Sequence, residues 1–93
     1  MTKLEGHGKL LRIYIGETDK YRGQPLYHAI VTAARKSGMA GATVYRGIEG
    51  FGARSRIHTA NILRLSEDLP IVVDIVDTGE KIDKFLPKLD DMV

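Results

Sequence analysis

One run of residues constrains the fold of this chain more than any other feature. Residues 71–76 read Ile-Val-Val-Asp-Ile-Val, and five of these six residues are β-branched. Branching at Cβ favours the extended backbone, and a run that is apolar on both faces is typical of a strand with neighbours on either side. Only Asp74 interrupts the apolar character. The sequence therefore predicts a strand over 71–76 at the centre of a sheet.

Two further segments have the pattern of strands. Lys9 to Ile15 alternates between two sets of side chains, as a strand does. A second strand is expected over 42–48, with Val44 and Ile48 buried and a bulge at Gly47. Both strands are candidates for neighbours of the central one.

Two segments have the apolar spacing of helices. Pro25 stands where the first helical residue is expected, and Gly38 is a suitable end for that helix. A second helix is expected after Asp77, which acts as its N-terminal cap, and its apolar stripe extends to Val93.

The order strand, helix, strand, strand, helix predicts an α+β fold. It matches a ferredoxin-like βαββαβ sandwich whose fourth strand is missing from this chain. A length of 93 residues fits one domain. We expect a flexible lead-in over 1–8, which has two glycines and no period, and a single domain over 9–93. The first strand then has an unpaired edge.

The second face of this sheet has an unusual composition for a surface. In the ferredoxin-like fold both helices cover one face, so the other face carries Leu10, Tyr14 and Tyr45 beside Arg12. A large apolar face is unfavourable in water. We therefore expect this face to pack against sister subunits.

Composition excludes several classes of chemistry. Cysteine is absent, which removes cysteine nucleophiles and thiolate metal sites and fits a reducing cytoplasm. The three histidines are far apart, so no metal site is expected. No apolar run approaches the ~20 residues that span a bilayer, so no membrane insertion is expected. A net charge of +2 is too small to indicate nucleic acid.

The charge is distributed unevenly along the chain. Residues 1–64 carry 11 Lys and Arg against 4 Asp and Glu, or +7, whereas residues 65–93 carry 3 against 8, or −5. Three explanations stay open: an anion site in the first part, head-to-tail contacts between subunits, and two differently solvated surfaces.

A glycine- and arginine-rich loop is the best candidate for a binding site. Residues 50–56 read Gly-Phe-Gly-Ala-Arg-Ser-Arg, and Arg46 and His58 extend the basic cluster. Backbone N–H groups in such a loop, together with guanidinium groups, form a good phosphate cradle. The alternative for the basic cluster is a solvated, mobile loop. For Phe51 the two interpretations are stacking on a base and pinning the loop to the core, and the second is favoured.

Three motifs resemble the PII nitrogen-regulator superfamily in their order and approximate spacing. They are Gly-Ala-Thr-Val at 41–44, Gly-Phe-Gly at 50–52, and Leu-Pro followed by the β-branched run at 69–77. The chain is similar above all to a PII-like branch, domain-of-unknown-function family 190, over about residues 11–89.

The resemblance implies a homotrimer of ferredoxin-like subunits whose sheets face a central axis. In that superfamily adenine nucleotides or related anions bind in clefts between subunits, and a long loop, here 50–64, acts on a partner protein. The partners are often membrane transporters or metabolic enzymes. By the same resemblance Thr43 stands beside the ligand, Gly50 and Gly52 line the cleft, and Arg54 senses the bound phosphates.

These observations together predict a non-catalytic, PII-like signalling protein of the cytoplasm. It requires no cofactor, and an adenine nucleotide is its candidate effector. The expected effector-binding residues are Thr43, Arg46, Gly50, Phe51, Gly52, Arg54, Arg56 and His58. The expected oligomer interface comprises Leu10, Arg12, Tyr14 and Tyr45.

Two alternatives of other classes stay open. The first is a small phosphate-processing enzyme of acylphosphatase-like architecture, although its arginine and asparagine pattern is poorly matched because Asn61 is the only asparagine. The second is an RNA-binding ferredoxin-like module, although residues 50–55 lack the alternating aromatic side chains of such modules.

Overall fold

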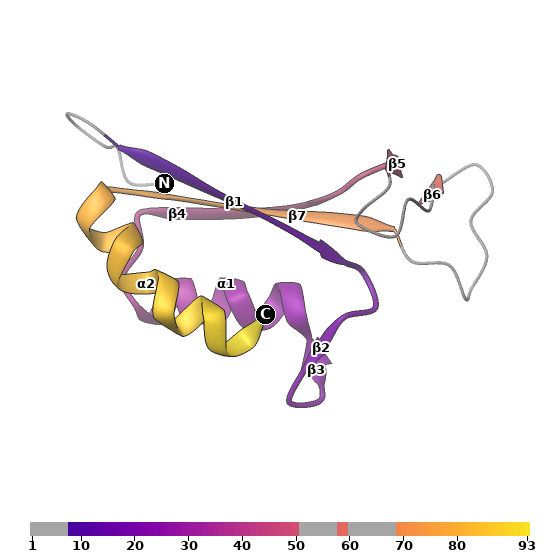
Figure 1. The fold of residues 1–93 in the computed structure, drawn as a ribbon, viewed down its shortest axis with the longest axis horizontal. Coiled ribbons are helices and arrows are strands. Elements are labelled where there is room, and N and C mark those ends of the chain that lie inside the picture. Colours follow the sequence, from indigo (N-terminus) through magenta and orange to yellow (C-terminus); the bar gives the residue numbers. More distant parts are fainter. Residues whose placement is uncertain (1–7, 51–57, 60–68) are drawn as a thin grey trace.

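The computed structural model of the protein describes residues 8–50, 58–59 and 69–93. The centre of this described part is an antiparallel sheet of three strands (Figure 1). Their order across the sheet is β1 (Lys9–Gly16), β7 (Pro70–Asp77) and β4 (Gly41–Arg46). The prediction that the β-branched run forms the central strand is therefore confirmed.

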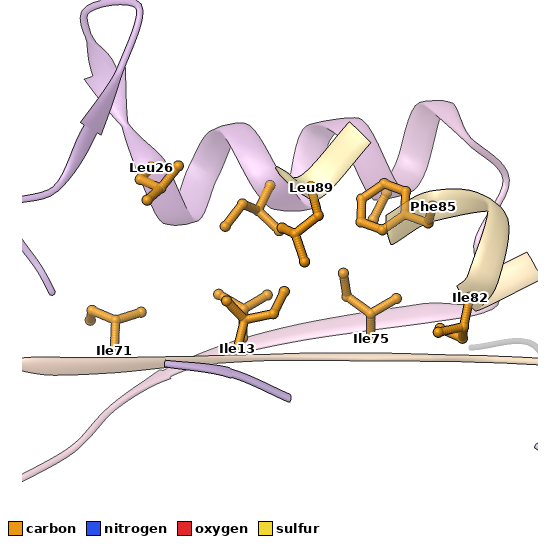
Figure 2. Close-up of a cluster of buried hydrophobic side chains, with 10 residues drawn as sticks. Ile13, Leu26, Ile71, Ile75, Ile82, Phe85 and Leu89 are labelled. Atoms are coloured by element: carbon orange, nitrogen blue, oxygen red, sulfur yellow. The ribbon is translucent and has the colours of Figure 1, made fainter. Parts of the chain in front are cut away.

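Two helices of the described chain, α1 (Leu26–Lys36) and α2 (Gly79–Met92), cover the same face of the sheet (Figure 1). Their apolar side chains meet those of the strands, and Leu89 stands over Ile13 while Phe85 stands over Ile75 (Figure 2). The buried cluster consists of Ile13, Leu26, Ile30, Ala34, Ile71, Val73, Ile75, Ile82, Phe85 and Leu89. Burial of one large apolar side chain contributes about 1.5–3 kcal/mol. The predicted α+β, ferredoxin-like architecture is confirmed.

The ends of α1 differ slightly from the expectation. The helix begins at Leu26, one position later than predicted, and Pro25, the predicted first residue, is its N-cap. It ends at Lys36, and Gly38 follows with a φ of +73°. This left-handed conformation is the one that glycine adopts most readily, so the predicted role of Gly38 is confirmed.

A short hairpin between β1 and α1 was not predicted. It consists of β2 (Lys20–Tyr21) and β3 (Gln24–Pro25), which pair antiparallel. Its turn residues, Arg22 and Gly23, have φ values of +50° and +82°. Turns of this kind favour asparagine or glycine at both positions. Because an arginine occupies the first position, the sequence does not indicate this turn.

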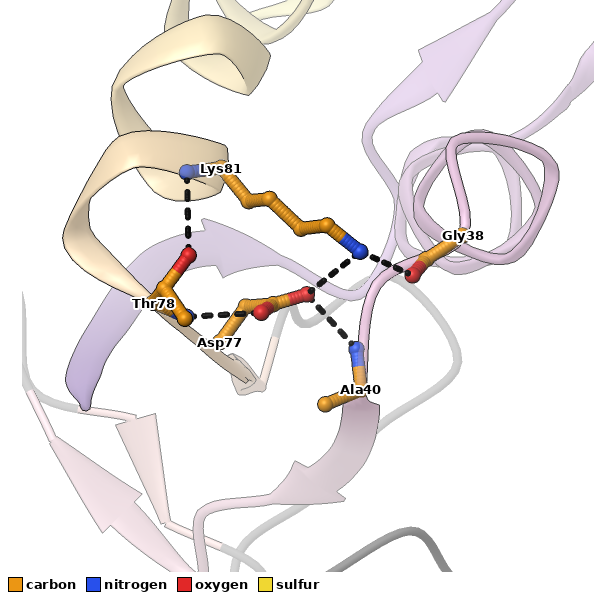
Figure 3. Close-up of polar contacts among 5 residues, drawn as sticks. All are labelled: Gly38, Ala40, Asp77, Thr78 and Lys81. Carbon is orange, nitrogen blue, oxygen red and sulfur yellow. Dashed lines mark hydrogen bonds and ion pairs between the residues drawn. The ribbon is translucent and has the colours of Figure 1, made fainter. Parts of the chain in front are cut away.

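Asp77 ends β7 and ties it to α2. It is 3% exposed, and its carboxylate accepts hydrogen bonds from the backbone N–H groups of Ala40 (2.9 Å) and Thr78 (2.6 Å) (Figure 3). The Lys81 Nζ lies 4.0 Å from this carboxylate. The N-cap of α2 is Thr78, whose hydroxyl accepts from the Lys81 N–H at 3.3 Å. The cap predicted at Asp77 is therefore wrong by one residue, because the Asp77 carboxylate holds the start of β4.

The apolar stripe of α2 is shorter than expected. Ile82, Phe85 and Leu89 are buried, and Leu86 packs partly against the core. Val93 follows the end of the helix and is 64% exposed. The predicted stripe is thus correct up to Leu89 and wrong at Val93.

Strand β4 ends at Arg46, before the predicted end at residue 48. The Gly47 N–H donates to the Pro70 carbonyl at 2.8 Å, which continues the register in which Arg46 faces Ile71. No extra residue is inserted, so the bulge predicted at Gly47 is wrong. Ile48 is 78% exposed instead of buried, because this end of β4 extends past the helices (Figure 1).

Candidate functional site

The face of the sheet opposite the helices, called here the open face, presents large apolar side chains to solvent. Leu10, Tyr14 and Tyr45 are 53%, 71% and 42% exposed. Val72 and Val76 of β7 lie between them and are half-buried. The alternation of strand side chains predicted this placement, and the structure brings all four predicted interface residues to this face. Its members are Leu10, Arg12, Tyr14, Gly41, Thr43, Tyr45, Val72, Asp74 and Val76.

The strand register arranges the open face in three rows that run across the strands. An aliphatic row and an aromatic row flank a polar row. From the aliphatic end, the rows are Leu10, Val76 and Gly41; Arg12, Asp74 and Thr43; and Tyr14, Val72 and Tyr45. Each row has one residue from each of the three strands, with β7 in the middle.

Asp74 is the centre of the polar row. Its Oδ1 accepts from the Arg12 Nε at 2.9 Å, and its Oδ2 accepts from an Arg12 terminal nitrogen at 3.1 Å. The Tyr45 hydroxyl donates to the same Oδ2 at 2.9 Å. A bidentate, charge-assisted pair of this kind is stronger and more rigid than a neutral hydrogen bond. Arg12 and Asp74 are thus engaged with each other inside one subunit.

The hydrogen bonds of this cluster shift the acidity of its members. Hydrogen bonds from the Arg12 guanidinium lower the pKa of the Asp74 carboxyl, and the same pair raises the pKa of Arg12. The hydrogen bond to Asp74 raises the pKa of the Tyr45 hydroxyl, because a phenolate would lose that bond and face a carboxylate. At neutral pH the cluster is an ionised Asp74, a charged Arg12 and a protonated Tyr45.

Asp74 was not among the predicted site residues, although the sequence contains a signal for it. It is in phase with Val72 and Val76 and out of phase with the buried residues of β7. Its side chain therefore points to the open face, where Arg12 and Tyr45 were already expected. The pairing of Asp74 with Arg12 could not be predicted, because the register between the strands is not determined by any local sequence pattern.

A second group of predicted residues lies where β4 leaves the sheet. Gly50 belongs to β5 (Glu49–Gly50), which pairs with β6 (His58–Thr59) so that Gly50 faces His58. A Cβ atom at Gly47 would lie 2.8 Å from the Pro70 Cγ, and one at Gly50 would lie 3.2 Å from it. Close backbone approach to Pro70 therefore explains both glycines without a ligand.

The Arg46 guanidinium at this end of β4 forms an ion pair with the carboxylate of Glu17, the residue after β1. The Glu17 N–H donates to the Leu69 carbonyl at 2.9 Å, which holds the acid near the start of β7. Arg46 remains 59% exposed in its side chain. The arginine predicted to bind an anion is therefore accessible but already has an acidic partner.

The structure does not bring all of the predicted effector residues together within one subunit. Thr43 faces Asp74 on the open face, whereas Arg46, three positions along, points to the opposite face of β4. These two side chains therefore do not face a common site within the described part of the chain. Four predicted residues lie outside the described part of the chain: Phe51, Gly52, Arg54 and Arg56.

The described ranges contain neither a metal-binding cluster nor a membrane-spanning helix. Among residues 8–50, 58–59 and 69–93, no three His, Asp or Glu side chains are grouped as metal ligands. Neither helix in the described part of the chain is long and apolar enough to cross a membrane.

The antiparallel sheet with β7 at its centre and two helices on one face define a protein of the α+β, ferredoxin-like class. The sequence profile of domain-of-unknown-function family 190 (DUF190), described as "Uncharacterized ACR", matches residues 8–93. The chain therefore belongs to the DUF190 family, a member of the PII-like superfamily, as the sequence motifs predicted.

Proteins of two distant organisms are similar to this chain over most of its length. A UPF0166 protein of Methanocaldococcus jannaschii is 41% identical over 85 residues, which are 91% of this chain and 78% of the relative. A UPF0166 protein of Aquifex aeolicus is 40% identical over 81 residues, which are 87% of this chain and 77% of the relative. A second one from Aquifex aeolicus is 41% identical over 51 residues, or 55% of this chain and 53% of the relative.

Proposed function

We propose that this protein is a non-catalytic regulatory homotrimer that binds a small anionic effector in the clefts between its subunits. The observation that carries the proposal is the open face, where the apolar residues Leu10, Tyr14 and Tyr45 are exposed around a polar row whose charges are already paired. Contiguous exposed apolar faces mark interaction surfaces in soluble proteins. Membership of the PII-like superfamily supports a sister subunit as the cover.

On this proposal, the effector binds at the end of β4. Arg46 is exposed there, and Gly47 and Gly50 allow the backbone to run close to Pro70. Arginine suits phosphate because its planar fork donates two parallel hydrogen bonds. An anion that reaches Arg46 competes with the Glu17 carboxylate, so binding releases Glu17. An adenine nucleotide is the effector class that the superfamily supports.

Residues 50–64 begin at Gly50 of β5, four positions after Arg46 at the end of β4, so on this proposal they are the segment that the anion site controls. In the proposed mechanism, Arg46 binds the anion and Glu17 is released, and these two events change the conformation of residues 50–64. The segment then acts on a partner protein such as a membrane transporter or a metabolic enzyme. The protein itself makes and breaks no covalent bond.

Calorimetric titration of the full chain with adenosine mono-, di- and triphosphate tests the effector site. We expect saturable binding that Arg46→Ala weakens about tenfold or more, because a charge-assisted hydrogen bond contributes about 1.5–3 kcal/mol. The matched control is Arg35→Ala, which removes an arginine from the last turn of α1. The nucleotide should be recovered unchanged by chromatography.

Three outcomes would each contradict one part of the proposal. Equal binding by Arg46→Ala and the wild type would remove Arg46 from the site. Turnover of the nucleotide would contradict a non-catalytic protein. Light scattering that shows a monomer at micromolar concentration would contradict the homotrimer.

A further inference from the structure

A groove lies between α1 and the C-terminal part of α2, on the side of the sheet away from the open face (Figure 1). Its volume of about 330 Å³ is within the range of about 300–1,000 Å³ that is typical of small-molecule sites. The β2–β3 hairpin bounds one end of the groove. The Leu26 N–H donates to the Asp19 carbonyl at 2.8 Å, which holds the hairpin beside the start of α1. Among the described residues that line the groove, none belongs to the open face or to the end of β4.

The floor of the groove is apolar. Ala29 and Ala33 are one turn apart on the side of α1 that lines the groove, and their small side chains leave the space open. Tyr21 of the hairpin and Met92 of α2 complete the floor, and both pack against the core. An aromatic ring and a flexible thioether provide good contacts for an apolar group. This part of the groove therefore fits an apolar side chain.

Three charged side chains line the same groove: Lys36, Lys88 and Asp91. The Lys88 Nζ donates to the Ser37 hydroxyl at 3.0 Å, which holds this ammonium group beside the end of α1. An ammonium group has three donors, so Lys88 keeps two for a ligand. Lys36 and Asp91 have no hydrogen bond or ion pair to a residue in the described ranges. The groove thus offers both positive and negative groups that are available to a ligand.

The order of these charges along the groove follows from the directions of the two helices. The start of α2 lies beside the end of α1, because the Lys81 Nζ donates to the Gly38 carbonyl at 3.4 Å (Figure 3). Lys36 is the last residue of α1, so it lies at the same end of the groove as Lys88. Asp91 is three positions after Lys88, about one helical turn closer to the hairpin. Two ammonium groups are therefore followed by a carboxylate and then by the aromatic end of the groove.

We propose that this groove is a binding site for an α-amino acid with an apolar side chain. The carboxylate of the ligand accepts hydrogen bonds from Lys36 and Lys88, and its ammonium group donates to Asp91. Its side chain lies on the apolar floor and points to Tyr21. A simple anion would leave Asp91 unpaired next to a negative ligand, and a simple amine would lie next to two ammonium groups, so the groove discriminates against both. This site is separate from the proposed anion site at Arg46 and does not depend on it.

Titration of the full chain with leucine, followed by ¹H–¹⁵N NMR, tests the site, because this measurement detects weak binding and also locates it. The groove is open to solvent and the ligand is small, so we expect a Kd of the order of 1 mM. The largest shifts should occur at Tyr21, along residues 29–36 and along residues 88–92. Absence of saturable shifts, or largest shifts on the open face, would overturn the proposal.

Two analogues separate the charged groups of leucine. 4-Methylpentanoate lacks the ammonium group and 3-methylbutylamine lacks the carboxylate, whereas the branched apolar part is the same. Each analogue should bind about twofold to fivefold more weakly than leucine, which is the usual scale for an exposed ion pair. If either analogue binds as tightly as leucine, the groove takes a simple anion or a simple amine and the proposal is wrong.

Neighbouring residues of the same charge provide matched controls. Asp91→Asn should remove the preference for leucine over 4-methylpentanoate, whereas Asp90→Asn, one position outside the groove, should keep it. Lys36→Met should reduce the preference for leucine over 3-methylbutylamine. Lys84→Met removes an exposed lysine of α2 that pairs with Glu80 at 3.4 Å, and it should keep that preference. Unchanged preferences in both Asp91→Asn and Lys36→Met would overturn the assignment of the charged groups.

The space above the floor is tested by Ala33→Leu, whose larger side chain should weaken leucine binding about tenfold or more. Circular dichroism of this variant identifies any loss of folding, and Asp91→Asn then decides the matter because Asp91 is exposed. Equal binding of leucine by a folded Ala33→Leu would overturn the proposal. Asp91→Asn should bind adenine nucleotides as the wild type does, so this inference and the proposed function fail independently.

Discussion

Asp74 is an acid in the middle of a central strand, where acids are rare. Its position is tolerated because a cross-strand partner of opposite charge stands on one side and a tyrosine hydroxyl on the other. The side chain is 16% exposed, less than the 45% of its partner Arg12. The cluster thus joins all three strands of the described sheet through side chains as well as through the backbone.

The first residue-level prediction concerns the titration of Asp74. Its pKa is lowered by Arg12, so the pair stabilises the folded state above the ordinary carboxyl pKa, and this contribution is lost as the pH falls through the lowered value. In Arg12→Met the pKa of Asp74 should rise, and acid unfolding should begin at a higher pH. Carboxyl carbon shifts measured by NMR against pH report the change, and an unaltered titration of Asp74 would contradict the pairing.

The second residue-level prediction concerns Gly47. A Cβ atom there would lie 2.8 Å from the Pro70 Cγ, which is closer than real Cβ contacts. Gly47→Ala should therefore lower the free energy of unfolding by about 1–3 kcal/mol, the usual effect of overpacking. Urea unfolding measures this loss. The double variant G47A/P70A should recover part of it, and additive losses would argue against a clash with the proline ring.

Individual residues show which features of the structure could be predicted from the sequence. Alternation alone placed Leu10, Tyr14 and Tyr45 on one face, because the period of a strand is fixed by the backbone. It could not pair Arg12 with Asp74, which are 62 residues apart in the chain. Such a contact depends on which strands are neighbours and in which register, and neither is encoded in a local window.

At the scale of elements, the sequence predicted the type of every long helix and strand that the structure describes. The ends were less predictable. Asp77 and Thr78 are adjacent and both suit an N-cap, but the carboxylate of Asp77 is occupied by the Ala40 N–H from another part of the chain. The hairpin over 20–25 was missed because Arg22 is a poor indicator of a left-handed turn residue.

The element-level prediction tests Asp77 as the joint between β7, β4 and α2. Asp77→Ala leaves the Ala40 and Thr78 N–H groups without their acceptor in a partly buried place (Figure 3). The free energy of unfolding should fall by about 2–4 kcal/mol, because each unsatisfied buried donor costs about 1–3 kcal/mol. Asp83→Ala, which removes an exposed ion-pair partner on α2, is the control and should change stability by less than about 1 kcal/mol. Equal losses in chemical denaturation would contradict a joint at Asp77.

At the scale of the molecule, the core lies entirely between the helices and one face of the sheet. The other face and the outer edge of β1 have no partner among the described residues. Of the candidate effector residues that the structure describes, Thr43 lies on the open face and Arg46 on the other face at the end of β4. Strand alternation could predict that these two side chains lie on opposite faces, because residues 43 and 46 are an odd number of positions apart.

The molecular prediction is that thermal stability depends on protein concentration. Association that buries the open face binds the folded chain and not the unfolded one, so mass action raises the midpoint of unfolding as concentration increases. Scanning calorimetry across a hundredfold range of concentration should show a rising midpoint in the wild type and a flat one in Asp74→Leu. A flat wild-type curve would contradict association through this face.

Strand β7 is the last strand of the described sheet along the chain, yet β1 and β4 are joined only through it. On the ribosome, β1 and β4 are therefore complete long before the strand that unites them, and their ladders with β7 form only once residues 70–77 have emerged. Pairing over such sequence distances is slow and leaves strand edges open to wrong partners in the meantime. The sheet of this domain therefore forms during synthesis only after residues 70–77 have emerged, and the nascent chain exposes unpaired strand edges until then.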